Sequence, residues 1–133
     1  MHPDPLDSRA RLFEARVLLL FTPDLVRGAD PLAVLERALP WIDVVQVRPK
    51  AVAAAGGDTP APCSAREVFD WTRRVLALEA VRRAGVLVMV DDRVDVAAAL
   101  WNEGCAGVHV GQDDTPAAVA RAFLGEGPLI GVS

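Results

Sequence analysis

The fold expected for this chain follows from the stretch Val86-Leu87-Val88-Met89-Val90-Asp91-Asp92-Arg93-Val94-Asp95-Val96-Ala97-Ala98-Ala99-Leu100. Five apolar residues end abruptly in two aspartates, and apolar residues then recur at helical spacing, which predicts a buried strand leading directly into an amphipathic helix. The arrangement returns at residues 107–116, where a short apolar run is again followed by two acids and a helical segment. Acids thus follow two successive strands, at the end where parallel α/β folds bind ligands.

Strand and helix signals alternate along the rest of the chain. Strands are expected at 17–21, 42–48, 86–90, 104–110 and 129–133, and helices at 31–39, 65–84, 94–101 and 116–124. Four βα units and a final strand predict an α/β fold, either a (β/α) barrel or an open doubly wound sheet. A G-x-G-x-x-G turn follows none of these strands, which argues against a dinucleotide-binding fold.

Local signals place the element ends. Asp30 before Pro31, Ser64 with Glu67, and Thr115 before a proline are helix N-cap patterns. The run 17–21 is continuously apolar, so we expect that strand to be buried on both faces. Residues 1–15 form a polar N-terminal segment, either a mobile tail or a short lead-in helix, and the domain proper is expected over 16–133. Small, Gly and Pro residues at 51–64 predict a flexible loop.

Composition limits the function classes. The 133 residues carry a net charge of −4 and no basic patch, so a nucleic-acid partner is not expected. No apolar run approaches the length of a membrane span, and no signal peptide is recognisable at the N-terminus. Cys63 and Cys105 lie far apart without a Cys-x-x-Cys pattern, which favours reduced thiols in a cytoplasmic protein.

The second expected strand ends in charged residues. Gln46, Arg48 and Lys50 alternate, so their side chains are expected to point to one side at its carboxyl end. A planar guanidinium beside an ammonium suits phosphate or diphosphate recognition, although the same pattern also occurs as ordinary solvated charge.

The acids after the third and fourth strands form a candidate metal site. Asp91 and Asp92 would lie close to Asp113 and Asp114, because neighbouring parallel strands are about 4.8 Å apart. One carboxylate from each strand would then share Mg²⁺, which binds one or two carboxylates together with substrate phosphates. The alternative is that these acids serve the N-termini of the following helices.

Two further polar residues lie on the last two strands. His109 alternates with valines inside an apolar strand, which suits an interior histidine as well as a base. Ser133 follows the fifth strand, where its hydroxyl would donate to a phosphate. Basic groups on one strand and acids on the next two, all at one rim, predict a metal–diphosphate site.

Four motifs in this order resemble the thiamine-phosphate synthase and thiazole tautomerase family. They are Gln46-x-Arg48-x-Lys50 and the segments at 90–97, 107–114 and 130–133, and the similarity extends from about residue 16 to residue 133. The resemblance implies a TIM barrel and a Mg²⁺-dependent transferase of thiamine biosynthesis. That enzyme joins hydroxymethylpyrimidine diphosphate to thiazole phosphate and releases pyrophosphate, through a pyrimidine cation.

The resemblance also implies roles for particular residues. Catalytic residues would be Arg48, Lys50 and His109. Substrate-binding residues would be Gln46, Arg48, Lys50, Asp91 and Ser133, and the Mg²⁺ ligands would be Asp92 and Asp114. Two departures stand out: Asp91 replaces the asparagine that is usual in the family, and Pro23 displaces the acid that normally follows the first strand's threonine.

The chain is short for the implied fold, since a TIM barrel has eight strands and about five strands and four helices are expected here. We therefore expect an incomplete barrel, whose unpaired edges favour association. Three situations follow: a fragment of a longer gene product, a truncated protein that completes the barrel as a homo-oligomer, or a degenerate remnant. The alternatives to the synthase are a tautomerase-like isomerase, which needs no metal, and a non-catalytic half-barrel that requires a partner.

Overall fold

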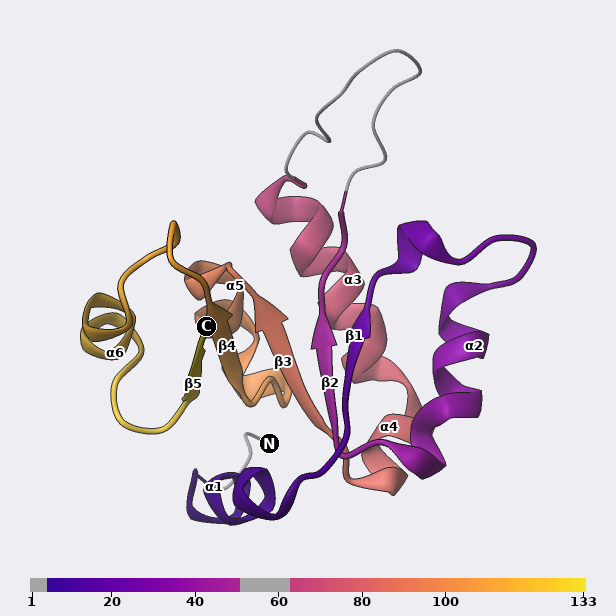
Figure 1. Cartoon of the computed structure of the whole chain (residues 1–133), viewed down its shortest axis with the longest axis horizontal. Coiled ribbons are helices and arrows are strands. Elements are labelled where there is room, and N and C mark those ends of the chain that lie inside the picture. The colour runs from indigo at the N-terminus through magenta and orange to yellow at the C-terminus, as the bar shows by residue number, and fades with distance from the viewer. Residues whose placement is uncertain (1–4, 51–62) are drawn as a thin grey trace.

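The computed structural model describes residues 5–50 and 63–133 and contains one parallel sheet (Figure 1). Its strands are β1 (Leu18–Phe21), β2 (Val44–Val47), β3 (Leu87–Asp91), β4 (Gly107–Val110) and β5 (Leu129–Val132). They lie in the order β1-β2-β3-β4-β5, so each strand pairs with its neighbour in the sequence. The order runs in one direction as in a barrel, whereas a doubly wound sheet reverses it. The sheet is open, which confirms an α/β fold of the incomplete barrel type.

Helices connect the strands. They are α1 (Pro5–Glu14), α2 (Pro31–Ala38), α3 (Ala65–Ala77), α4 (Glu79–Ala84), α5 (Val94–Leu100) and α6 (Ala117–Leu124). Short 3₁₀ turns follow β1, α2 and α5, at η1 (Pro23–Leu25), η2 (Leu39–Trp41) and η3 (Trp101–Glu103). Of the two alternatives for the N-terminal segment, the lead-in helix is confirmed over the described part. This helix, α1, lies across the lower end of the sheet in Figure 1. The predicted loop at 51–64 falls mostly outside the described residues.

Two predicted helix caps are confirmed and one is wrong. Asp30 accepts a hydrogen bond from the backbone N–H of Leu32, and Ser64 forms a reciprocal capping box with Glu67. Thr115 does not cap α6, whose N-cap is Pro116.

The single helix predicted over 65–84 is also wrong, because α3 and α4 are separated at Leu78. Its backbone is extended, with ψ at 121°, and its partly buried side chain packs against the core. The sequence carries no glycine or proline there, so tertiary packing interrupts a continuous helical pattern. Gly85 ends α4 in the left-handed conformation that favours glycine.

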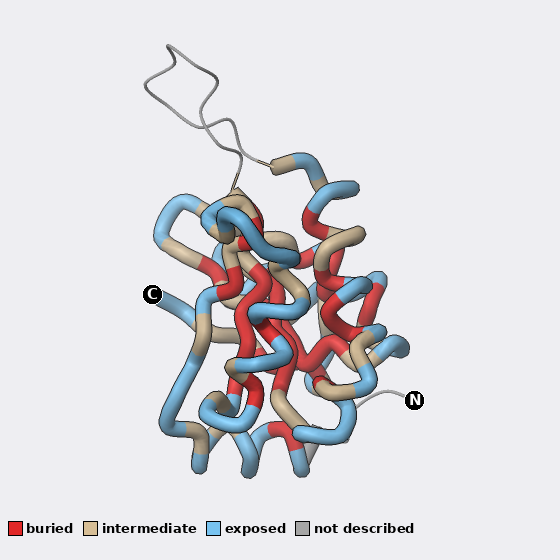
Figure 2. Tube along the Cα trace, turned by 90° about the vertical axis from the view of Figure 1, so that its right-hand side faces the viewer, coloured by how far each residue is buried: buried red, intermediate tan, exposed pale blue. Residues whose placement is uncertain are grey.

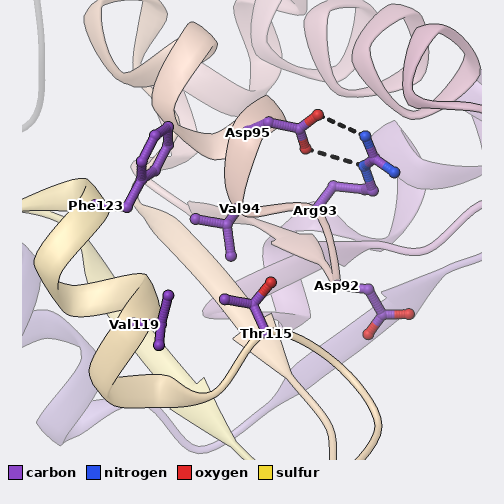
Figure 3. A pocket seen from close by; sticks show the side chains of 7 residues that line it. All are labelled: Asp92, Arg93, Val94, Asp95, Thr115, Val119 and Phe123. Atoms are coloured by element: carbon purple, nitrogen blue, oxygen red, sulfur yellow. Dashed lines mark hydrogen bonds and ion pairs between the residues drawn. The ribbon is translucent and has the colours of Figure 1, made fainter.

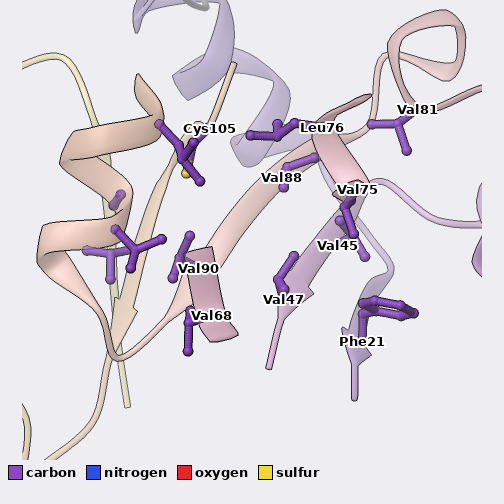
Figure 4. Close-up of a cluster of buried hydrophobic side chains, with 14 of the residues drawn as sticks. Phe21, Val45, Val47, Val68, Val75, Leu76, Val81, Val88, Val90 and Cys105 are labelled. Carbon is purple, nitrogen blue, oxygen red and sulfur yellow. The ribbon is translucent and has the colours of Figure 1, made fainter. Parts of the chain in front are cut away.

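The main core lies between the sheet and the helices α2 to α6. One face of the strands supplies valines and other apolar residues that pack against these helices, as Figure 4 shows for Val45, Val47, Val88 and Val90. A smaller cluster on the opposite face contains Val44, Leu87, Met89, Ala106 and Leu129, with Leu12 and Ala15 from the α1 end packed against it. Buried residues follow the strands in Figure 2.

Strand β1 departs from the prediction of burial on both faces. Leu18 and Leu20 are 47% and 48% exposed, whereas Phe21 on the other face is buried. The reason is that β1 and β5 each pair with one described strand, so the inner face near these edges lacks the cover that a closed barrel provides.

The cysteine prediction agrees with the structure, since neither Cys63 nor Cys105 forms a disulfide. Burial raises the pKa of the Cys105 thiol to about 12, which keeps it protonated and unreactive. Among the described residues, no helix is both long and apolar enough to cross a membrane.

Candidate functional site

Asp91, the last residue of β3, contacts the polar side chains at the end of β2. Its Oδ1 accepts a hydrogen bond from Gln46 Nε2 at 2.7 Å, and its Oδ2 accepts one from Lys50 Nζ at 3.2 Å. The Arg48 Nε lies 3.5 Å from the same Oδ2. These three groups leave the Asp91 side chain only 10% exposed. The predicted alternation of Gln46, Arg48 and Lys50 therefore brings all three to one carboxylate.

The charge of Asp91 is balanced by two cations that follow β2 and not by Arg93. Arg93 instead forms a two-pronged pair with Asp95 on the first turn of α5, with Nε to Oδ1 at 2.9 Å. Figure 3 shows this pair pointing away from Asp92. Arg48 and Lys50 are thus the cations that offset the added carboxylate at position 91.

Asp92 occupies a strained backbone position, with φ at 66°, a conformation that residues other than glycine seldom adopt. Its N–H donates to the His109 carbonyl at 2.8 Å, which links the ends of β3 and β4. The N-cap of α5 is Arg93, so the alternative in which Asp92 caps this helix is wrong. The strained turn instead directs the carboxylate toward the rim, where Oδ2 lies 3.5 Å from Lys50 Nζ.

Asp92 and Asp114 form a carboxyl pair across the ends of β3 and β4. Partial burial raises the pKa of Asp92 to about 6, and a hydrogen bond with the Asp114 carboxyl and the negative charges of Asp91 and Asp114 add to the shift. Lys50 opposes it. Asp114 Oδ2 also accepts the Gly111 N–H at 2.7 Å, which fixes the loop after β4. Like charges held this close favour a bound proton or a bound cation.

His109 and Ser133 occupy the neighbouring positions on β4 and after β5. His109 is opposite Asp91 in the strand register and Gly131 on the other side. A Cβ on Gly131 would lie 2.5 Å from His109 Nδ1, so the imidazole rests directly on the glycine backbone. Ser133 Oγ and Asp114 Oδ2 both lie within 4.0 Å of the point where a Gly111 side chain would begin. Asp114 and Ser133 therefore both flank Gly111, at the end of β4.

Two adjoining cavities open at this rim. One, of about 330 Å³, is lined by Pro49, Lys50, Cys63, Val68, Asp91, Asp92, Arg93, Asp114 and Thr115. The other, of about 400 Å³, shares Asp92, Arg93 and Thr115 and extends to Val119 and Phe123 of α6 (Figure 3). The first cavity is polar and carries both an ammonium and the carboxyl pair, which suits an anionic ligand accompanied by a divalent cation.

The carboxylates at the rim are the candidate ligands for a metal ion. In the described ranges, no group of three or more His, Cys, Asp or Glu side chains is placed to hold one. The two carboxyl groups of Asp92 and Asp114 are nevertheless sufficient for Mg²⁺, which keeps water and substrate oxygens as its other ligands. The close acid pair therefore fits Mg²⁺ bound together with a phosphate ligand.

Asp24 is a site residue that the sequence interpretation missed. It lies in η1 after β1, and its Oδ2 accepts the backbone N–H of Lys50 at 2.8 Å. The sequence signal was an acid close behind the first strand, but Pro23 made that acid look displaced. The 3₁₀ turn of Pro23–Leu25 brings the Asp24 carboxylate to the backbone of Lys50.

Comparisons with known proteins show what this chain is similar to. The family model described as thiamine monophosphate synthase matches residues 18–133. A thiamine-phosphate synthase from Mycobacterium sp. (strain KMS) is 36% identical over 131 residues, covering 98% of this chain and 55% of the relative. One from Chloroflexus aurantiacus is 38% identical over 127 residues, covering 95% of this chain and 51% of that relative.

A solved structure shows the same fold. Thiamine phosphate pyrophosphorylase from Pyrococcus furiosus superimposes with a TM-score of 0.61 at 23% identity, over 87% of this chain and 48% of that protein. The chain spans about half the length of the curated relatives it matches.

Proposed function

Because the chain belongs to the thiamine monophosphate synthase family, we propose that it supplies the diphosphate-binding half of a thiamine-phosphate synthase site. The reaction joins hydroxymethylpyrimidine diphosphate to thiazole phosphate and releases pyrophosphate. The observation that carries the proposal is the meeting of Arg48 and Lys50 with the Asp92–Asp114 pair at one rim. Cationic groups beside a pair of metal-binding acids are what a departing pyrophosphate requires.

Mg²⁺ would be held by Asp92 and Asp114. When bound, it supplies positive charge that stabilises pyrophosphate as the carbon–oxygen bond to the pyrimidine breaks. The protein's own contribution is positioning: the Asp92 turn and the Gly111–Asp114 hydrogen bond hold the two carboxyl groups at adjacent strand ends. Removing either acid leaves a single carboxylate, which is expected to weaken the affinity for Mg²⁺.

The basic residues would bind the diphosphate itself. Arg48 and Lys50 are half exposed and face the rim, so their N–H groups are available to phosphate oxygens once Asp91 is displaced as their partner. The guanidinium binds two oxygens at once, whereas the ammonium acts as a point charge. Ser133 flanks Gly111, as Asp114 does, and would donate its hydroxyl to the same diphosphate.

Gln46 and His109 would form the inner wall on the pyrimidine side. Both residues lie on the sheet face that bears Asp91. Gln46 donates a hydrogen bond to Asp91, and His109 is the register partner of Asp91 on β4. Gln46 is buried and His109 half-buried, so they contact the apolar part of a bound substrate more readily than the exposed phosphates. We assign Asp91 to substrate binding through its effect on Arg48 and Lys50.

We propose that further strands complete the pocket. The exposed inner-face residues Leu18 and Leu20 lie on β1, at one edge of the sheet, and β5 forms the other edge. Three more strands between these edges would close an eight-stranded barrel. A second copy of the chain and a longer gene product are two sources of these strands. We expect a cytoplasmic setting, which the spacing of the two cysteines in the sequence favours.

The acid pair favours the synthase over the tautomerase-like alternative, because aromatisation of a thiazole phosphate needs no metal. A direct test measures thiamine phosphate formed from the two phosphorylated precursors, with Mg²⁺ and with excess chelator. The 133-residue chain, a version extended to eight strands, Asp92→Asn and the neighbouring-acid control Asp113→Asn would be compared.

The expected result is Mg²⁺-dependent product from the extended protein, strongly reduced by Asp92→Asn and unchanged by Asp113→Asn. Product from the 133-residue chain would require an oligomer, which sedimentation analysis would detect. Thiazole aromatisation without thiamine phosphate would favour the tautomerase, and inactivity of every version would leave a non-catalytic half-barrel.

A further inference from the structure

Asp24 accepts a backbone hydrogen bond at the point where the backbone pairing of β1 and β2 ends. The last backbone bond on this side runs from the Arg48 N–H to the Phe21 carbonyl, at 2.8 Å. Pro49 follows and has no N–H to donate. The next donor, the N–H of Lys50, binds the Asp24 carboxylate at 2.8 Å. A side chain from η1 thus continues the pairing where β1 has already turned away.

This contact fixes Lys50 at its backbone, while two acids hold its other end. The ammonium lies 3.2 Å from Asp91 Oδ2 and 3.5 Å from Asp92 Oδ2. The Lys50 side chain is nevertheless 42% exposed and its four-carbon chain is flexible. These ion pairs therefore restrict the position of the ammonium only weakly. Whether the ammonium reaches the rim therefore depends on where the backbone of residue 50 is held.

The short turn that carries Asp24 is itself well defined. The Leu25 N–H donates to the Thr22 carbonyl at 3.1 Å, and the Val26 N–H donates to the Pro23 carbonyl at 3.0 Å. Pro23 is buried and presets its own backbone angle. Asp24 is consequently presented from a small rigid element that starts directly after β1.

We propose that Asp24 is a positioning residue: it holds the Lys50 backbone so that the ammonium reaches the diphosphate rim. The inference rests on the proposed function, because it assigns Asp24 a purpose within that site. Asp24 acts through Lys50 and does not itself contact the ligand. Its carboxylate charge is engaged by an N–H, which limits its repulsion of a phosphate.

The test uses Asp24→Ala, which removes the acceptor, and Asp24→Asn, which keeps an acceptor oxygen. Asp30→Ala is the matched control, because Asp30 also accepts a backbone N–H, from Leu32 at 3.1 Å, but at the start of α2. Pyrophosphate affinity is measured by calorimetry with Mg²⁺ present, in the wild-type and Lys50→Ala backgrounds. The Lys50 amide resonance is followed in parallel by NMR without ligand.

A hydrogen bond to a charged acceptor is worth about tenfold in an equilibrium constant, so we expect Asp24→Ala to weaken pyrophosphate binding by about that factor. Asp24→Asn should recover most of the loss, and Asp30→Ala should have no effect. In the Lys50→Ala background, Asp24→Ala should change nothing further. An equal loss in both backgrounds, or no loss in the wild-type background, would overturn the proposal.

The NMR measurement separates this inference from the proposed function. If the wild-type chain does not bind pyrophosphate, the proposed function fails for this chain, and the Lys50 amide resonance alone decides the role of Asp24. An upfield shift of that resonance in Asp24→Ala, absent in Asp30→Ala, supports the backbone restraint. An unchanged Lys50 resonance refutes it.

Discussion

Replacing Asp91 by asparagine is expected to tighten pyrophosphate binding about tenfold, because the native carboxylate competes with phosphate for two cations. Lys50 Nζ and Arg48 Nε lie 3.2 Å and 3.5 Å from Asp91 Oδ2. Asparagine has nearly the same size and keeps an oxygen that accepts the hydrogen bond from Gln46. The substitution therefore removes the charge without opening a cavity.

The magnitude follows from the two ion pairs. Partly exposed pairs contribute up to about 1 kcal/mol each, so a phosphate that takes both cations from Asp91 gives up about 1 to 2 kcal/mol. Since about 1.4 kcal/mol corresponds to a factor of ten, relief of this competition gives an increase of about fivefold to thirtyfold. The effect should diminish at high salt, because exposed charges are screened.

Calorimetric titration of pyrophosphate in the presence of Mg²⁺ measures the effect. Asp95→Asn is the matched control, because it removes one carboxylate from an ion pair with Arg93 and changes the net charge equally. We expect Asp95→Asn to bind like the wild type. The reasoning would be refuted if Asp91→Asn bound pyrophosphate no more tightly than the wild type while the control was unchanged. Asp91 would then hold Arg48 and Lys50 in position for the phosphate instead of competing with it.

Three further predictions concern stability. Ser64→Ala should lower the free energy of unfolding by about 1 kcal/mol in denaturant titrations, because it removes the capping box of α3, and Ser64→Asp should restore it. Gly131→Ala should cost about 1 to 3 kcal/mol, because the new methyl would collide with His109, and the cost should largely vanish in a His109→Ala background. The folded-state pKa of Asp92 is raised to about 6, so the folded protein holds more protons than the unfolded chain between about pH 4 and pH 6. Stability should therefore fall by at most about 1 kcal/mol as the pH rises through this window, and Asp92→Asn should abolish that part of the pH dependence.

The succession of strands and helices along the chain was predictable because each strand carries its own local signal. An apolar run followed by polar residues and a helical pattern marks each βα unit. Right-handed connections left two topologies, and the observed order of the strands in the sheet is the one of the barrel type. The strands were predicted too long; for example, β4 begins at Gly107 and not at residue 104. The break at Leu78 and the exposure of β1 had no local signal, because both depend on what packs against them.

The sequence predicted which residues lie together at the rim, but not which side chains contact one another. Alternation placed Gln46, Arg48 and Lys50 on one side, and the structure brings all three to Asp91. The partner of Asp91 was not predictable, because Arg93 is adjacent in sequence yet turns to Asp95. Asp24 was missed for the related reason that a turn of three residues changed its apparent spacing. The functional roles of these residues remain predictions.

The Asp91→Asn experiment also distinguishes two ways in which this acid would affect Mg²⁺. Apart from Arg93, which pairs with Asp95, the described rim residues include two cations, Arg48 and Lys50, against the carboxylates of Asp91, Asp92 and Asp114. A diphosphate without a metal therefore meets an unfavourable charge. If Asp91 acts only by occupying the cations, its removal and the addition of Mg²⁺ should contribute independently. The gain from Asp91→Asn should then be similar with Mg²⁺ and with chelator. A gain that disappears when Mg²⁺ is present would mean that Asp91 helps to bind the metal, and the pair Asp92–Asp114 would be insufficient by itself.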